Sequence, residues 1–403
     1  MRVNNLKFRS SFSTDYSNIN DDQFFDPSTT DGVAVGGKAI KGLFRNTTWI
    51  NENTLTYQNT FKEKNSLTVL GGFSVQSSKI NASSIRGQGF PAGSGLQNIS
   101  SASSITAASD INTGWGLVSF LARANYSYDS KYLLSASARY DGSSRFNPSG
   151  RWGVFPAVSA GWVLTREAFL DHSKWLTNLK IRASYGLTGD QEIGNFQYLS
   201  YWSPGRYDGY AGLRPRNLGN NDLTWQRNKM FNIGADFEIA KGKFSGSVEY
   251  FKGNRTKLLA NAVLPATSGF SSLTINSGNV ENSGVELSLN AYVIKKKDFN
   301  WNASFNISFI KNRIKSLYSD NELINAYTDL FPTHILKVGE AVGSFWGIQY
   351  DGVDPQTGDP IYNDLNKDGV IDDADSRVLG KATPDFFGGL TNDFRYKNWC
   401  CFA

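Results

Sequence analysis

Segment 364–375 carries the residues best suited to binding a ligand. Asp364, Asn366 and Asp368 alternate along it, and Gly369 follows them directly. Side-chain oxygens at the first, third and fifth positions of a loop, with a glycine at the sixth position for a sharp turn, are typical of calcium-binding loops. The sequence therefore predicts a calcium loop over residues 364–375.

The second half of this segment supplies the remaining predicted ligands. Val370 offers its carbonyl oxygen, Asp372 is placed to act through a water, and Asp375 stands where a glutamate usually closes the shell. Hard oxygen ligands favour Ca²⁺ over zinc or copper. Aspartate is shorter than glutamate, so we expect weak binding. The flanking residues read as loop, which indicates an isolated calcium loop, and an acidic turn without an ion is the alternative.

Other chemistry is sparsely represented. The chain has only 2 His, no Ser-His-Asp spacing suited to catalysis and no phosphate-binding glycine loop, so we predict that it is not an enzyme. Lys plus Arg number 41 against 36 for Asp plus Glu, a mild and dispersed excess that does not indicate nucleic-acid binding. Several aromatic residues fall in predicted loops, where they either stack on sugar rings or pack the loops together; they are Trp202, Tyr207, Tyr210, Phe331, Phe345 and Trp346.

In the segments between these loops, apolar and polar residues alternate with a period of two. From Phe299 to Phe309 every odd position is apolar and every even position is Asn or Ser. Such alternation predicts a strand with one apolar and one polar face. Twelve stretches of the chain alternate in this way. The chain is therefore predicted to be all-β.

Three features favour a membrane barrel over a soluble sandwich. The strands run to roughly ten residues, the length of a tilted membrane crossing. Their polar face is mostly Ser, Asn, Thr and Gly, which suits a crowded aqueous lumen. Tyr132 and Tyr140 bracket one stretch, and eight residues at about 3.3 Å, tilted by about 40°, cover roughly 20 Å between the two aromatic belts. The apolar face is thus expected to contact outer-membrane lipid.

Connector lengths support the same topology, because they alternate between short and long. The predicted short turns are 62–65, 129–130, 241–242 and 295–298, and the predicted long loops are 17–41, 80–113, 200–222, 259–279 and 313–383. Outer-membrane barrels have short periplasmic turns and long extracellular loops. We therefore predict an antiparallel transmembrane β-barrel of about twelve strands, with the calcium-like loop inside the extracellular region 313–383.

Several ordered blocks resemble those of SusC/RagA-type TonB-linked outer-membrane transporters. The blocks are YDGSSRF (140–146), RWGVFP (151–156), AGW (160–162), ASYGLTGDQEIG (183–194), NSGNVENSGVEL (276–287) and NENTLTY (51–57). Read by their residues alone, they are predicted to be architectural, with Gly142, Gly153 and Gly161 allowing tight bends and close strand approach.

This resemblance implies a larger barrel of about twenty-two strands with a plug in its lumen, located in the bacterial cell outer membrane. It implies import of glycans, oligosaccharides or peptides, driven by TonB, with a SusD-like surface lipoprotein at the extracellular mouth. Residues 1–403 are then expected to be a partial barrel without signal, plug and last strands, not competent for transport alone. The alternatives are a TonB-dependent receptor for siderophores or other metal chelates, and a surface adhesin or structural barrel. The substrate-binding residues are not predicted.

Overall fold

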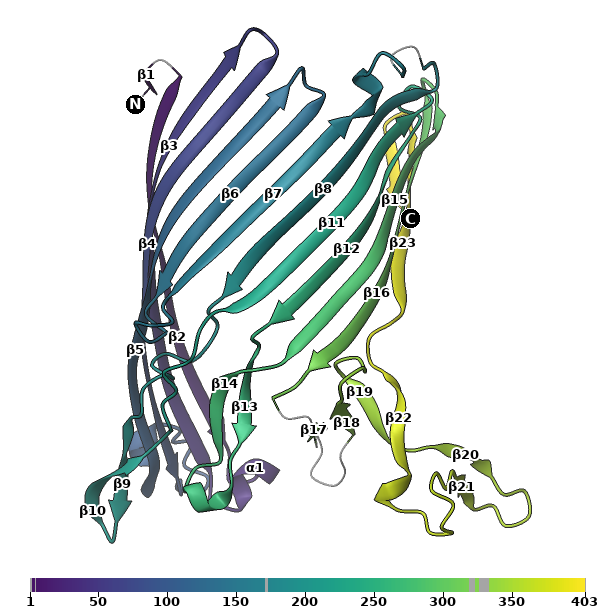
Figure 1. Cartoon of the computed structure of the whole chain (residues 1–403). Coiled ribbons are helices and arrows are strands. Elements are labelled where there is room, and N and C mark those ends of the chain that lie inside the picture. Colours follow the sequence, from purple (N-terminus) through teal and green to yellow (C-terminus); the bar gives the residue numbers. More distant parts are fainter. Residues whose placement is uncertain (1, 4, 171–172, 319–322, 326–332, 403) are drawn as a thin grey trace.

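The computed structural model describes residues 2–3, 5–170, 173–318, 323–325 and 333–402, and one antiparallel sheet of 14 strands dominates it (Figure 1). Each strand pairs with the next strand of the sheet along the chain, so hairpins build the whole wall. The strands of this sheet are β1 Arg2–Val3, β2 Leu6–Phe25, β3 Lys38–Phe61, β4 Asn65–Gln88, β5 Ser104–Tyr128, β6 Tyr132–Ser143, β7 Trp152–Val163, β8 Leu176–Asp190, β11 Gln226–Ile239, β12 Phe244–Thr256, β15 Asn279–Lys295, β16 Phe299–Ser316, β23 Phe386–Tyr396 and β24 Trp399–Phe402.

Twelve of these strands are long, from 11 residues in β23 to 25 in β5, and the short β1 and β24 lie at the two edges. The predicted all-β fold and the predicted number of membrane strands are therefore confirmed. Among the described residues, no helix has the length and apolar character needed to cross a membrane.

The two faces of the sheet differ in chemistry and in exposure. On β6, Leu134 is 56% exposed, whereas Leu133 and Ser135 on the opposite face are half-buried. We call the face that carries Leu134 the outward face and the opposite face the inward face. The same alternation continues along β7, where Val154 is exposed and Phe155 is buried. A soluble sheet buries its apolar face, so exposed apolar side chains in this regular pattern indicate contact with lipid.

Aromatic rings gather near both ends of the outward apolar band. Tyr132 stacks between Tyr128 and Trp162 near the turn that follows β5, with ring centroids 6.3 Å apart in both pairs. Toward the other end of the same strands, Tyr140 stacks on Trp152 at 4.6 Å. Such belts mark the two interfaces of a membrane-spanning barrel.

Tight turns join the strands at one end of the wall, as predicted. In the β5–β6 turn, Asp129 and Ser130 have φ of 51° and 53°, and the Lys131 amide donates to the Tyr128 carbonyl at 2.9 Å. Left-handed residues at both central positions define a type I′ turn, whose twist matches that of paired strands. The longer β7–β8 connection also lies at this end and contains η2 Leu164–Arg166 (Figure 1).

At the opposite end of the wall, two of the predicted loops are wrong in extent. Residues 17–41 and 80–113 are mostly strand, because β2 to β5 continue far beyond the predicted membrane crossing and leave only 26–37 and 89–103 as connectors. Their Ser, Asn and Gly residues have low strand propensity, but β3 from Lys38 to Tyr57 and the whole of β4 have hydrogen-bonded neighbours on both sides. Pairing with neighbours therefore outweighs propensity here. The two connectors contain α1 Thr30–Val33 and η1 Ile99–Ser101.

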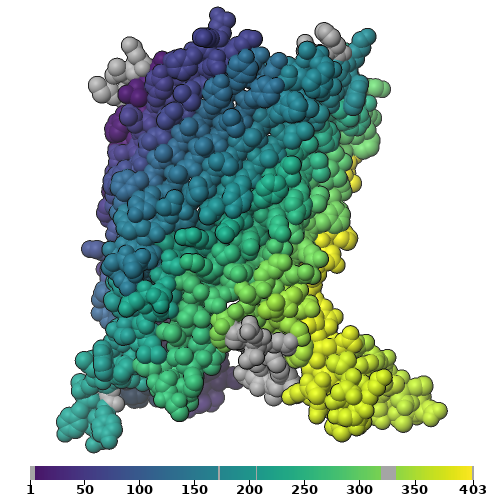
Figure 2. Space-filling view, viewed as in Figure 1, coloured from purple at the N-terminus to yellow at the C-terminus, as the bar shows by residue number. Residues whose placement is uncertain are grey.

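The other long connectors also lie at this end, and small hairpins order them (Figure 1). Figure 2 shows that they project beyond the otherwise continuous surface of the strands. The predicted region 313–383 begins inside β16, and its residues 319–322 and 326–332 lie outside the described residues. The elements are β9 Trp202–Tyr207, β10 Tyr210–Pro215, β13 Leu259–Val263, η3 Ala266–Ser268, β14 Ser272–Asn276, β17 Leu323–Asn325, β18 His334–Leu336, β19 Ser344–Ile348, β20 Tyr350–Val353, β21 Pro360–Tyr362, η4 Asp373–Asp375 and β22 Ser376–Lys381.

Candidate functional site

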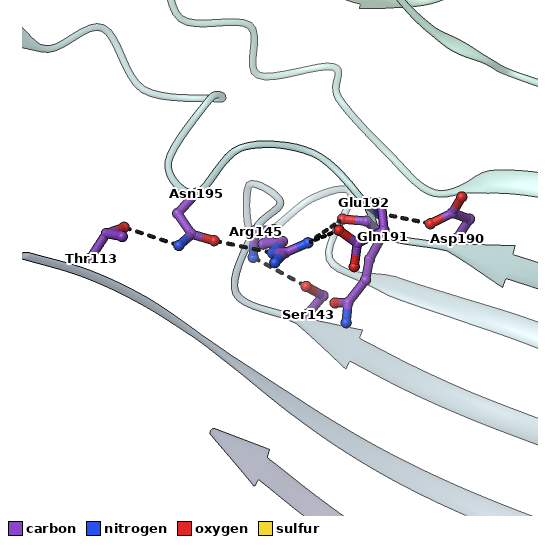
Figure 3. A network of polar contacts seen from close by, with 7 residues as sticks. All are labelled: Thr113, Ser143, Arg145, Asp190, Gln191, Glu192 and Asn195. Atoms are coloured by element: carbon purple, nitrogen blue, oxygen red, sulfur yellow. Dashed lines mark hydrogen bonds and ion pairs between the residues drawn. The ribbon is translucent and has the colours of Figure 1, made fainter. Parts of the chain in front are cut away.

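A buried arginine ties three parts of the long-connector end together (Figure 3). Arg145 follows β6 and is only 9% exposed. Its Nε donates to Oδ1 of Asn195 at 3.1 Å, and its Nη1 donates to the carbonyl of Gln191 at 3.1 Å. Asn195 in turn donates to the hydroxyl of Thr113 on β5 at 3.0 Å. Arg145 therefore joins the loop after β6 to the loop after β8 and to β5.

The ion pair in this network contributes less to its stability than the buried hydrogen bonds do. Arg145 Nη1 lies 3.2 Å from a carboxylate oxygen of Glu192, but the Glu192 side chain is 76% exposed. Exposed ion pairs contribute little because water and salt screen them. Hydrogen bonds from a buried guanidinium to amide and carbonyl oxygens are stronger, and they also fix the geometry.

An apolar cluster packs beside this network. Phe146 and Leu223 are fully buried, and Phe155 and Trp225 are nearly so. The Trp225 ring centroid lies 5.3 Å from those of both Phe146 and Phe155, and its indole N–H donates to the Arg151 carbonyl at 2.8 Å. The blocks 140–146, 151–156 and 183–194 thus meet in one core, which supports their architectural interpretation.

Two of the three glycines that were predicted to allow close strand approach lie directly against aromatic rings. A Cβ on Gly142 would lie 2.7 Å from the Trp152 ring, and one on Gly153 would lie 2.5 Å from Phe155 Cζ. At Gly161 the nearest atom would be the flexible Lys180 side chain at 3.3 Å, a much milder contact. The prediction of close approach therefore applies to the first two positions, where the neighbour is an aromatic ring.

The inward face carries charged groups that cross strands. Arg182 on β8 lies 3.2 Å from a carboxylate oxygen of Asp236 on β11 and 2.6 Å from one of Glu249 on β12. Arg139 on β6 binds Asp141 at 3.1 Å and the Ser119 hydroxyl at 2.9 Å. Alternation along a strand predicts which face is polar, but it does not predict these partners, because they depend on strand register.

A hollow of about 720 Å³ interrupts the polar inward face. Leu121, Arg139 and Phe155 form one row across β5, β6 and β7 in its floor. Leu70 and Trp225 also line it. Apolar side chains beside arginines make this the part of the inward face best suited to contact another polypeptide or a mixed polar and apolar solute. This hollow was not predicted, because isolated inward Leu and Phe residues carry no periodic signal in the sequence.

The loop aromatics named above are spread apart. Trp202, Tyr207 and Tyr210 lie on the β9–β10 hairpin and are strongly exposed, with Tyr207 at 86%. Phe345 is exposed on β19, whereas Trp346 is half-buried with the Lys337 ammonium 5.9 Å from its ring centroid. Phe331 lies outside the described residues. The hairpin is therefore the strongest candidate among them for contact with a ligand or partner.

The calcium-like loop curls around its own backbone amides. The Asp364 carboxylate accepts from the amides of Lys367 at 2.6 Å and Gly369 at 2.8 Å. Gly369 has φ of 84°, as the predicted turn requires. The fully buried Asp375 carboxylate accepts from the amides of Leu365 at 2.7 Å and Asp372 at 2.9 Å. These hydrogen bonds, that from Asp372 first, lower the pKa of Asp375, so it stays ionised.

The remaining predicted ligands are arranged in the same way. Asn366 Oδ1 accepts from the Asp368 amide at 3.0 Å, Asp368 from the Val370 amide at 2.8 Å, and Asp372 from the Ala374 amide at 2.8 Å. The donor set is all oxygen, which fits Ca²⁺. Within the described part of the chain, no three His, Cys, Asp or Glu side chains converge as a ready-made metal site. Ion binding would therefore need the carboxylates to turn inward, and it stays a prediction.

Long hairpin strands, an exposed apolar face, a polar inward face and alternating connector lengths together define the wall of a transmembrane β-barrel. Residues 3–397 match the family model described as "TonB dependent receptor-like, beta-barrel". The chain belongs to this family of the bacterial outer membrane.

Relatives and solved structures narrow the family further. The chain is 32% identical to TonB-dependent receptor P3 of Formosa agariphila over 98% of its own length and 42% of the relative's. It is 34% identical to TonB-dependent receptor SusC of Bacteroides thetaiotaomicron over 70% of this chain and 30% of SusC. The structure of the RagAB peptide transporter matches all of this chain and 46% of that chain, with 25% identity and a TM-score of 0.86. The resemblance to SusC/RagA proteins is thus confirmed, and the chain spans less than half the length of these relatives.

A more distant solved structure shares the barrel fold. The structure of the FpvAI–pyocin S2 complex matches with 12% identity and a TM-score of 0.52, and that likeness shows the fold alone.

Proposed function

We propose that this chain forms part of the wall of an outer-membrane importer for oligosaccharides, other glycan fragments or peptides, with TonB supplying the energy. The observation that carries the proposal is likeness to SusC and to the RagAB peptide transporter, which extends over all of the chain in the latter. The ferripyoverdine receptor of Pseudomonas aeruginosa has a TM-score of only 0.51. A siderophore receptor is therefore the weaker alternative, and the proposed role of the chain is transport, not catalysis.

The inward face supports passage of polar solutes. Ser and Asn side chains and the paired charges of Arg182 line one region of it. The row of Leu121, Arg139 and Phe155 adds an apolar surface with a cation beside it. Such a mixed surface suits the amide and apolar groups of peptides or the two faces of sugar rings.

We propose a SusD-like lipoprotein as the partner at the extracellular mouth. The support lies in the β9–β10 hairpin, which projects at the long-connector end and exposes Trp202, Tyr207 and Tyr210 (Figure 1). Tyr and Trp are enriched in the contact surfaces of protein complexes. The buried core around Arg145 holds residues 191–195 of the connector that leads to this hairpin.

Uptake measurements in the source bacterium test the proposal. Cells that lack the gene for this protein are given fluorescently labelled mixtures of oligosaccharides or of short peptides, with and without TonB. We expect the deletion to abolish accumulation of at least one mixture, and loss of TonB to do the same. Unchanged uptake with impaired growth under iron limitation would instead support a siderophore receptor. Unchanged uptake with lost surface attachment would support an adhesin.

We also propose that the loop 364–375, within the extracellular region 313–383, binds Ca²⁺ as a structural ion. The support is an all-oxygen donor set at calcium-loop spacing, together with the left-handed turn at Gly369. By connector parity this loop faces the outside of the cell.

A further inference from the structure

Five basic side chains gather on the outward face near the long-connector ends of β11, β12 and β16. Outward positions on these strands are identified by the exposed apolar residues that share their parity, such as Phe231, Tyr250 and Phe309. The five are Lys229, Lys252, Lys311, Arg313 and Lys315, all exposed, and we call them the basic patch.

Strand register places these residues side by side. Lys252 pairs with Ser283 on β15, and Ser283 pairs with Lys311 on β16. In the adjacent row, Lys229 pairs with Asn254, which pairs with Glu281, which pairs with Arg313. With strands about 4.8 Å apart and successive residues about 3.3 Å apart, the patch spans roughly 14 Å by 13 Å. It is compact enough for one ligand to contact several of its members.

Among the described residues of this surface, Glu281 is the one carboxylate. Glu281 lies 3.0 Å from the Lys252 ammonium and 3.5 Å from that of Lys315, and it is mostly buried between them. Lys229, Lys311 and Arg313 have no carboxylate within ion-pair distance among the residues that the structure describes. The patch therefore keeps a strong positive charge after its internal pairs are counted.

The membrane-facing band begins directly next to the patch. Following the same strands toward the short turns, the next outward residues are Phe231 and Ile233 on β11, Tyr250 on β12, Val285 on β15 and Phe309 on β16. The outward positions beyond them remain uncharged as far as the turns, through Phe244 on β12 and Phe299 on β16. The patch thus lies where the hydrocarbon ends and lipid headgroups begin, on the extracellular side.

We propose that the basic patch binds the phosphate groups of a lipid in the outer leaflet of the outer membrane. Its charge is opposite to that of phosphate, and guanidinium and ammonium groups are the usual phosphate donors. Because the patch continues into the apolar band, lipid tails lie against the band and lipid headgroups lie beside the patch. A soluble acidic protein would match the charge of the patch but not the adjoining apolar band. The inference rests on the barrel in its membrane and does not depend on which solute is imported.

Lipid binding to the purified protein tests this. The protein, extracted from outer membranes into a neutral detergent, is titrated with diphosphorylated lipid A, with the same lipid after removal of its phosphates, and with inorganic phosphate. Native mass spectrometry counts the bound lipid. The test variant is Lys252→Gln with Lys311→Gln and Arg313→Gln. The matched control removes three cations from inward positions, by Arg9→Gln, Lys180→Gln and Arg255→Gln.

We expect the test variant to bind lipid A about a hundredfold more weakly. Each cation near an anionic lipid surface strengthens binding about fivefold, and the variant lacks three of them. The control should bind as the unchanged protein does, removal of the lipid phosphates should weaken binding similarly, and inorganic phosphate should not compete at equal concentration. Heat-modifiable migration of both variants shows that each has folded. Equal lipid binding by test variant and control, or full binding of the lipid without phosphates, would overturn the proposal. Competition by inorganic phosphate at equal concentration would overturn its assignment to a lipid.

Discussion

The guanidinium of Arg145 lies over the indole ring of Trp115, 4.9 Å from the ring centroid. Trp115 belongs to β5 and Arg145 to the loop after β6, so the contact fixes that loop onto the wall. A cation held over Trp is stabilised further when water is excluded, as it is here. The same guanidinium holds the loop after β8 through Gln191 and Asn195.

Replacing Arg145 should therefore loosen both loops without unfolding the barrel. Arg145→Met removes the hydrogen bonds and leaves buried oxygens unpaired, which we expect to cost about 2–3 kcal/mol locally. Hydrogen exchange of residues 191–195 measures this as faster exchange. Glu192→Gln is the control, because its exposed ion pair should contribute less than about 1 kcal/mol. Similar exchange in Arg145→Met and in the unchanged protein would show that the network does not hold the loops.

Charge should be tolerated unequally on the two faces of β16. Phe305 forms an outward row with Leu289 and Leu390, whereas Asn306 forms an inward row with Ser288. Phe305→Arg places a cation in lipid and should cost about 2–4 kcal/mol at mid-membrane depth, whereas Asn306→Arg should cost far less. Reversible unfolding in lipid vesicles gives both values. Equal costs at the two sites would refute the assigned facing.

Much of the fold follows from the sequence for a simple reason. Alternation along a strand depends only on local order, so the apolar outward side chain of Phe305 and the polar inward one of Asn306 can be read directly. The extent of β4 through Gln88 could not be read, since hydrogen bonds to β3 and β5 hold it and those partners are distant in sequence. The Arg145–Asn195 contact was missed for the same reason, because it joins two loops fifty residues apart.

Acid should weaken the short-turn end of the wall through Glu167. Its carboxylate accepts from the Tyr132 hydroxyl at 2.7 Å and from the Trp162 indole at 3.1 Å. These hydrogen bonds, that from Tyr132 first, lower the pKa of Glu167 below its ordinary 4.5. The unfolded chain therefore binds the proton more readily, so this stabilisation is present above pH 4.5 and is lost as pH falls through the folded pKa.

Unfolding at a series of pH values from about 7 to about 3 measures this loss. Glu167→Gln should remove the part of the pH dependence that this carboxylate causes, and Tyr132→Phe should reduce it. Identical pH profiles for Glu167→Gln and the unchanged protein would show that Glu167 does not couple folding to pH.

Calcium should order the loop 364–375. Without the ion, the carboxylates of Asp364, Asp368 and Asp375 repel one another. Backbone amides hold all three, and the side-chain amide of Asn366 also donates to Asp368. With Ca²⁺ bound, we expect the loop to resist protease. Asp364→Ala with Asp368→Ala removes two charged predicted ligands and should abolish this protection. The barrel strands should stay intact, because among the described residues none of their hydrogen bonds involves the loop.

Limited proteolysis with Ca²⁺ and with chelator, in wild type and variant, is the measurement. The compared quantity is the change in cleavage rate on adding Ca²⁺, because the double variant also loses the amide hydrogen bonds of Asp364 and is cleaved faster in either condition. A control with Asp359→Ala and Asp373→Ala removes the same charge from exposed positions that are not predicted ligands, and it should keep the protection. Since extracellular sites of this kind bind in the range of about 10⁻⁴–10⁻³ M, millimolar Ca²⁺ is the appropriate concentration. If chelator leaves cleavage of the wild-type loop unchanged, the segment is an acidic turn stabilised by its own amides and the calcium proposal fails.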